Sequence, residues 1–107
     1  MRPIEFQILL TLATGERHGY AIIQDIEARS DGAISVETGT LYRALQRLVE
    51  EGLVRPTEPR RALPDDDERR RFYAITAEGR RAATVEARRM AELVAAARAA
   101  RLMPEGT

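Results

Sequence analysis

The segment GTLYRALQRLVEEGLV, residues 39–54, contains an amphipathic helix, the end of that helix and the start of a strand. Four of its apolar residues recur at helical spacing on one side of a helix that we place at residues 40–51: Leu41, Ala44, Leu45 and Leu48. The opposite side carries polar residues and a glycine: Gly39, Arg43, Gln46, Arg47 and Glu50. Gly52 ends the helix, because glycine readily adopts the left-handed conformation that follows a helix. The segment therefore predicts a helix that packs through one face and leaves a polar face exposed.

Two further helices are expected before this segment. Residues 3–14 begin with Pro3, which suits a first helical turn, and place four apolar residues at helical spacing: Ile4, Ile8, Leu9 and Leu12. After a turn at residues 15–19, residues 20–29 predict a second helix with an apolar side made of Tyr20, Ile22, Ile23 and Ile26. Residues 33–39 then predict an extended connection to the third helix.

A hairpin and a long helix are expected after the third helix. Residues 53–58 predict a short strand in which Pro56 favours an edge position, and residues 69–75 predict the returning strand. Thr76 suits the cap of a final helix that continues to about residue 101, roughly 25 residues or about 38 Å. The hairpin thus has a long connection at its tip.

Three short helices followed by a hairpin is the element order of a winged helix-turn-helix fold. The predicted fold class is mainly α with a small β-hairpin, plus a long C-terminal dimerisation helix. We assign residues 1–76 to the winged helix-turn-helix domain and residues 77–107 to the dimerisation helix and tail. In such a fold the third helix enters a DNA major groove about 12 Å wide.

The composition excludes several classes of chemistry. The chain has 107 residues, of which 44% are apolar and 32% charged, which predicts one folded domain. It has no cysteine and one histidine, His18, so thiolate zinc sites, iron–sulfur clusters, cysteine nucleophiles and multi-histidine sites are excluded. The sequence offers no glycine-rich phosphate loop and no nucleophile–base pair. We expect no enzyme activity and no cofactor, and we interpret His18 as a turn residue that hydrogen-bonds locally or to a phosphate.

The apolar runs are short. None approaches the roughly 18 residues that a membrane helix needs. The first stretch, residues 1–12, carries Glu5 inside its apolar segment and has no small-residue cleavage site. We therefore expect a cytoplasmic protein without a membrane partner.

The charge is unevenly distributed along the chain, although the formal net charge is zero. Residues 1–54 hold five arginines and eight acidic residues, a net charge of −3. Residues 55–107 hold twelve arginines and nine acidic residues, a net charge of +3. All 17 basic residues are arginine, the side chain that binds phosphate and guanine through two hydrogen bonds. The positive excess therefore coincides with the hairpin and the last helix.

The predicted hairpin carries five arginines around its tip: Arg60, Arg61, Arg69, Arg70 and Arg71. A wing with this charge would contact the DNA backbone or a minor groove. The acidic run at residues 65–68 supports an alternative, in which the connection neutralises its own charge. Likewise, the polar side of residues 40–51 is either a DNA-reading surface or an ordinary solvated helix face.

Four segments in order resemble the PadR family of bacterial transcriptional regulators: HGYAI at residues 18–22, GTLYRALQRL at 39–48, EGLV at 51–54, and DERRRFYAIT at 67–76 followed by Gly79. The resemblance covers about residues 4–100. It implies a winged-helix repressor that binds DNA as a homodimer, with the third helix in the major groove, the hairpin as a wing and a C-terminal helix that dimerises. The chain departs from the family at Glu37, where many relatives carry a small capping residue, and in the long acidic connection of the hairpin.

The expected partner is double-stranded DNA, and residues of the third helix are the expected contacts: Thr38, Thr40, Tyr42, Arg43, Gln46 and Arg47. Backbone N–H groups at the start of this helix also favour phosphate. At the border of the polar side, we expect the Tyr42 ring to pack and its hydroxyl to reach outward. Tyr20 is expected to face the core.

The last helix is expected to mediate dimerisation. A core of about 75 residues is too small to cover a helix of this length, so an apolar stripe is left for a second copy of the chain. The expected interface residues are Met90, Leu93, Val94, Ala97 and Ala100. The alternative is an alanine-rich tail that merely favours helix.

Two interpretations of the function follow. The first is a transcriptional repressor, and since relatives of the PadR family respond to small molecules, an effector is a further expected partner. The alternative is a winged-helix module that binds a protein partner instead of DNA.

Overall fold

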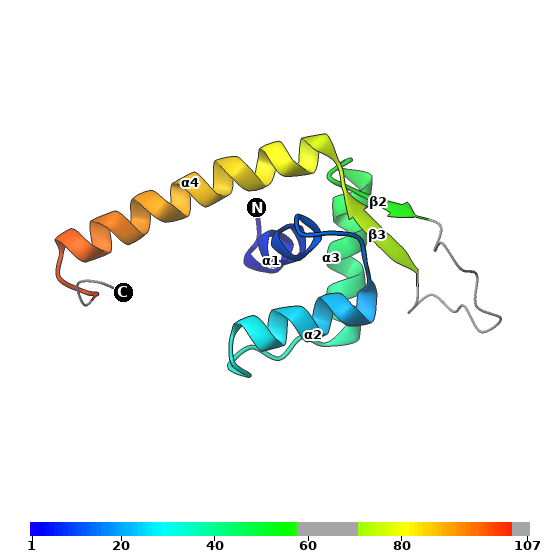
Figure 1. Ribbon diagram of the computed structural model, residues 1–107, viewed down its shortest axis with the longest axis horizontal. Coiled ribbons are helices and arrows are strands. Elements are labelled where there is room, and N and C mark those ends of the chain that lie inside the picture. The colour runs from blue at the N-terminus through cyan, green and yellow to red at the C-terminus, as the bar shows by residue number, and fades with distance from the viewer. Residues whose placement is uncertain (58–70, 104–107) are drawn as a thin grey trace.

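Four helices and three strands make up the parts of the chain that the computed structural model describes, residues 1–57 and 71–103 (Figure 1). In chain order they are α1 (Pro3–Leu12), β1 (Arg17–His18), α2 (Gly19–Arg29), α3 (Thr38–Glu50), β2 (Val54–Thr57), β3 (Phe72–Ile75) and α4 (Ala77–Ala99). The mainly α fold with a small sheet is confirmed. The division of the chain at residue 76 stays a prediction.

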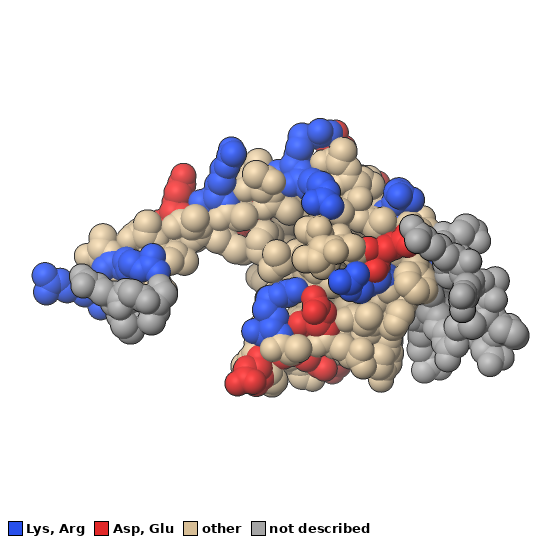
Figure 2. Space-filling view, in the orientation of Figure 1, with Lys and Arg blue, Asp and Glu red and all other residues tan. Residues whose placement is uncertain are grey.

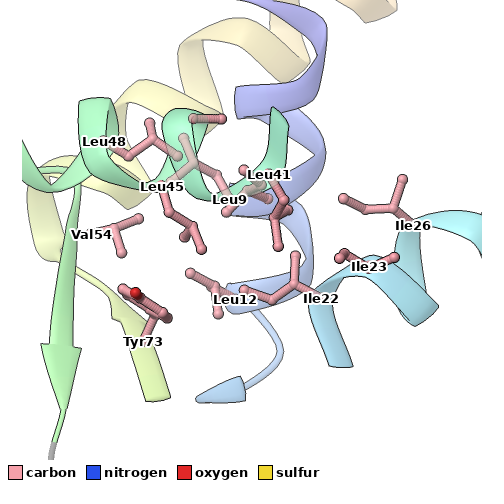
Figure 3. Packing of buried hydrophobic residues seen from close by; sticks show 12 residues of the cluster. Leu9, Leu12, Ile22, Ile23, Ile26, Leu41, Leu45, Leu48, Val54 and Tyr73 are labelled. Carbon is pink, nitrogen blue, oxygen red and sulfur yellow. The ribbon is translucent and has the colours of Figure 1, made fainter. Parts of the chain in front are cut away.

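Helix α1 lies at the centre of the core, where it contacts α2, α3, α4 and β3 (Figure 1). Its Ile8 and Leu9 side chains are fully buried, as the helical spacing predicted. Figure 3 shows apolar side chains of α1, α2 and α3 converging, with Val54 and Tyr73 of the sheet at one end of the cluster. One core therefore holds the three helices and the sheet together.

A polar network also joins α1 to α2. The buried Thr11 hydroxyl donates to Oδ2 of Asp25 at 2.8 Å and accepts from Nη2 of Arg29 at 3.0 Å. The same Arg29 nitrogen donates to Oδ2 of Asp25 at 2.8 Å. Because the buried hydroxyl both donates and accepts, its desolvation is compensated and α2 is held in register against α1.

Helix α3 buries the side that its periodicity predicted, since Leu41, Ala44, Leu45 and Leu48 are all buried. It begins at Thr38, two residues before the predicted start, with Glu37 as the N-cap residue. Thr38 and Gly39 thus belong to the first helical turn and not to the extended connection. The helix ends before Gly52, whose φ of +77° is the left-handed conformation expected there.

The sheet has three antiparallel strands in the order β1-β3-β2. Pro56 lies in β2 at one edge of this sheet, as its missing N–H predicted. The expectation of a two-stranded hairpin missed β1, in which Arg17 pairs with Tyr73 and His18 with Phe72. Two residues are too few to show an alternating pattern, so only the pairing with β3 makes this segment a strand.

Helix α4 starts at the predicted cap, because the Thr76 hydroxyl accepts from the Gly79 N–H at 3.0 Å. The helix then extends away from the other elements (Figure 1). The radius of gyration of 15.6 Å exceeds the roughly 13 Å expected for a compact chain of this length. Beyond Glu86, most side chains of α4 are exposed.

The start of α4 packs directly on the turn before β2. A Cβ atom at Gly79 would overlap the Leu53 carbonyl oxygen and lie 2.8 Å from Cγ1 of Ile75. The Thr76 hydroxyl also donates to the Gly52 carbonyl at 2.7 Å. This close approach fixes the direction in which α4 leaves the sheet.

Replacing Gly79 by alanine should therefore destabilise the fold by about 1–3 kcal/mol or more, because the backbone of the neighbouring turn must move. Gly39→Ala is a matched control in the first turn of α3, where the nearest atom to the added Cβ is the flexible Arg43 Nη1 at 3.3 Å. Chemical denaturation should show a large decrease in the free energy of unfolding for Gly79→Ala, and no change or a slight increase for Gly39→Ala. Equal free energies of unfolding for the two variants would contradict this packing.

Candidate nucleic-acid interface

The outer side of α3 presents polar side chains that make only weak contacts within the chain. Arg43 is exposed, and its Nη2 donates to the Thr40 hydroxyl at 3.4 Å. Gln46 is exposed, and its Nε2 donates to Glu50 Oε1 at the same distance of 3.4 Å. Hydrogen bonds this long on exposed groups are easily exchanged for others. The side chains of Arg43 and Gln46 are thus available to an external ligand.

Arg47 differs from its neighbours on this side of α3, and the expectation that it lies free on the polar face is wrong. Its Nε donates to Oε2 of Glu5 in α1 at 3.2 Å, and its side chain is only 32% exposed. Glu5 is buried, with 6% of its surface exposed. The Arg47 side chain therefore bridges α3 to the start of α1.

The two oxygens of the Glu5 carboxylate accept hydrogen bonds from different residues. Oε1 accepts from the Arg2 backbone N–H at 2.9 Å, which caps α1, while Oε2 accepts from Arg47. Burial raises the pKa of Glu5, but the hydrogen bond from the Arg2 N–H and the hydrogen bond and positive charge of Arg47 outweigh it. The pKa of Glu5 therefore lies below its usual range, and the carboxylate stays charged at neutral pH. The pairing of Glu5 with Arg47 could not be predicted from the sequence, because the two residues are 42 positions apart.

Tyr42 joins α3 to α2 instead of reaching outward. Its hydroxyl is buried, and a Cβ atom at Gly19 would lie 2.8 Å from the Tyr42 Cζ atom. The expectation of an outward hydroxyl is therefore wrong. Gly19 at the start of α2 provides the room that the tyrosine ring needs.

His18 has the local role that the sequence predicted. It is the N-cap residue of α2, and its Nδ1 accepts from the Ala21 N–H at 3.1 Å. Its ring also meets the edge of Phe72 on β3, with 5.5 Å between centroids. Tyr20, in contrast, is 53% exposed and does not face the core as expected. His18 therefore connects the start of α2 to β3.

The wing is described only near its base. Four of its predicted arginines lie outside the described residues: Arg60, Arg61, Arg69 and Arg70. Arg71 directly precedes β3 and is exposed. Arg55 on β2 is also exposed, and the alternation of a strand with Val54 facing the core would have identified it. Two cations are thus present at the base of the wing.

The predicted interface residues of α4 are uncovered by the described parts of the chain. Leu93 is 70% exposed, Met90, Val94 and Ala100 are also exposed, and Ala97 is half-buried. Exposed apolar side chains in one stripe mark an interaction surface on a folded protein. Their contact with a second copy stays a prediction.

Charges of both signs are exposed on the face drawn in Figure 2. Arginine and acidic side chains lie close to one another at several places on the described part of this face. Among residues 1–57 and 71–103, no cluster of three or more histidine, cysteine or acidic side chains could hold a metal ion. Of the helices in these same ranges, none is long and apolar enough to cross a membrane.

A helix pair followed by a sheet, with the second helix of the pair exposing a polar face, defines a winged helix-turn-helix protein. Residues 8–85 match the model of the transcriptional regulator PadR-like family, and the chain belongs to this family.

Solved structures support the same fold. A transcriptional regulator from Clostridium thermocellum superposes with a TM-score of 0.71 at 27% identity, covering 85% of this chain and 82% of that chain. Bacillus subtilis PadR in complex with operator DNA superposes with a TM-score of 0.61 at 25% identity, covering 78% of this chain and 45% of that chain.

A curated relative is much longer than this chain. It is an uncharacterized 37.1 kDa protein in transposon Tn4556 from Streptomyces fradiae, 40% identical over 86 residues, which are 80% of this chain and 22% of the relative. The match therefore spans about a fifth of that protein.

Replacing Arg47 by methionine should raise the pKa of Glu5, because burial would then act against the charged form with one fewer hydrogen bond to oppose it. A carboxyl group with a lowered folded-state pKa stabilises the fold above its unfolded pKa, and this contribution is lost as the pH falls through the folded pKa. Arg47→Met should thus be less stable at neutral pH and lose less stability on acidification. An NMR titration of the Glu5 carboxyl carbon, with Arg43→Met as control, measures the shift; an unchanged pKa in Arg47→Met would contradict the pairing.

Proposed function

We propose that this protein is a transcriptional repressor that binds a near-palindromic DNA operator as a homodimer. The observation that carries the proposal is the outer side of α3, where Arg43 and Gln46 are exposed opposite a fully packed face. Membership of the PadR-like family and the similarity to a regulator solved with operator DNA support it.

The exposed side chains suit a major groove. An arginine such as Arg43 can bind guanine through two hydrogen bonds, and a glutamine such as Gln46 can bind adenine in the same way. Thr38 and Thr40 lie in the first turn of α3, where hydroxyls and backbone N–H groups favour phosphate. In the proposed complex α3 reads the bases and its first turn fixes the position on the backbone.

The wing supplies further attraction in this proposal. Arg55 and Arg71 are exposed at its base, and the other arginines of the hairpin lie between them in the sequence. Each phosphate that an arginine neutralises releases counterions, which favours binding irrespective of sequence. The wing would therefore contribute affinity more than discrimination.

Dimerisation through α4 would give the symmetry that an operator requires. A two-fold pair of helix-turn-helix units reads two half-sites about 34–36 Å apart along the DNA. The uncovered stripe with Leu93 and Met90 supports this assembly. Release by a small-molecule effector is part of the proposal and rests on family membership.

The proposal predicts that the protein enriches one sequence motif from random DNA duplexes. Arg43→Ala should lower the affinity for that motif about tenfold or more, since a two-bond base contact contributes about 1–3 kcal/mol of discrimination. Arg88→Ala on α4 is the matched control, because it removes the same exposed charge at a distance from α3. The thermal midpoint of Arg43→Ala should be unchanged. If the wild-type chain enriches no motif, the protein-binding alternative becomes the better account.

A second prediction concerns the dimer. Leu93→Glu would bury a charge between two copies and should weaken association by about 3–5 kcal/mol. Ala95→Glu places the same charge on the opposite side of α4 and should leave association intact. Sedimentation equilibrium at micromolar concentration measures both, and a wild-type chain that sediments as a monomer throughout would refute dimerisation through α4.

A further inference from the structure

Arg47 is anchored at one edge of its guanidinium and open at the other. Its Nε donates to Glu5, but among residues 1–57 and 71–103 no acceptor takes a hydrogen bond from its Nη1 or Nη2. An arginine has five N–H donors in a rigid plane, so the terminal nitrogens keep their donors for another ligand. The side chain is 32% exposed, so the terminal edge is within reach of solvent.

The position of Arg47 places this open edge beside the candidate DNA-reading side chains. Arg43 and Arg47 are four residues apart on α3 and so are neighbours on one side of the helix. The carboxylate that holds Arg47 is itself fixed, because Glu5 is buried and its other oxygen accepts from the Arg2 N–H at 2.9 Å. The fixed carboxylate of Glu5 therefore holds the partly exposed guanidinium of Arg47 on α3.

We propose that Glu5 is a positioning residue for DNA binding: it holds the Arg47 guanidinium through Nε so that Nη1 and Nη2 are directed at a backbone phosphate. This inference rests on the proposed function. An arginine loses rotamer freedom when a ligand fixes it, and a side chain already ordered by Glu5 loses less of that freedom on binding. In this proposal the negatively charged Glu5 increases the affinity of the protein for DNA, although DNA is itself a polyanion.

A purely structural link between α1 and α3 makes a different prediction. In that case Glu5 would affect DNA only through the stability of the fold and through its charge. Removing the Glu5 charge would then reduce the repulsion between the protein and the DNA phosphates and should raise the affinity. The positioning role predicts the opposite, namely that removing the Glu5 charge lowers the affinity for DNA.

The test is the affinity of Glu5→Gln for the duplex motif selected by the wild-type chain. The amide keeps an oxygen that can cap α1 but loses the charge that holds Arg47. We expect Glu5→Gln to bind about tenfold more weakly, and the slope of log affinity against log salt to fall by about 0.9, the loss of one phosphate contact. Glu37→Gln is the matched control, because Glu37 is an exposed acid at the start of α3 without a side-chain cap bond, and its affinity should stay equal or rise.

A double-mutant cycle separates positioning from folding. In the Arg47→Met background, Glu5→Gln should no longer lower the affinity, because the side chain that it positions is absent. Arg47→Lys is a second test that leaves Glu5 intact. Lysine keeps the positive charge, but its single nitrogen cannot bond Glu5 and also present separate terminal N–H groups to a phosphate as arginine does. The affinity of this variant for DNA and its salt slope should therefore fall as well. Thermal unfolding identifies the temperature at which every variant is folded.

The outcomes are distinct. If Glu5→Gln binds as tightly as the wild type or more tightly, or lowers the affinity equally with and without Arg47, the positioning role is overturned while the proposed function stands. Wild-type affinity and slope in Arg47→Lys would overturn it too. If the wild-type chain enriches no motif, the proposed function fails and the inference fails with it.

Discussion

Burial of one face of α3 against α1 is the constraint on which the rest of the structure depends. Leu41, Leu45 and Leu48 are almost completely buried, so the rotation of α3 about its axis is fixed. Because a helix repeats every 3.6 residues, Arg43 and Gln46 must then lie on the outside. No separate interaction is needed to expose the candidate reading surface. The apolar spacing that folds the chain also determines which polar side chains a ligand meets.

Helix α1 connects α3 to the other helices. It carries the buried Thr11 that bonds α2, and its Glu5 holds Arg47 of α3. At the end of this helix, the Ala13 carbonyl accepts from Nη2 of Arg80 on α4 at 3.3 Å. Helix α3, whose outer side is proposed to read DNA, and α4, which is proposed to pair two copies, therefore both pack on α1.

The sequence predicted the helices, the cap at Thr76, the edge position of Pro56 and the buried side of α3, because each depends on short-range spacing. It predicted a local hydrogen bond for His18, but not that this residue caps α2. It did not predict β1, whose residues become a strand only by pairing with Phe72 and Tyr73. The contact of Arg47 with Glu5 was likewise missed, as any pair separated by 42 residues would be. Helical periodicity shows on which side of α3 Arg47 lies, but not that its side chain pairs with a carboxylate of another helix.

The central claim is that the outer side of α3 lies in a major groove, and cleavage from a tethered reagent tests it most directly. The chain has no cysteine, so Gln46→Cys provides one attachment point for a reagent that cuts DNA nearby. The account predicts strand breaks confined to the major groove within each half-site, and none from the same reagent attached through Arg88→Cys at an exposed position of α4. Breaks from the α4 position but not from α3 would contradict it.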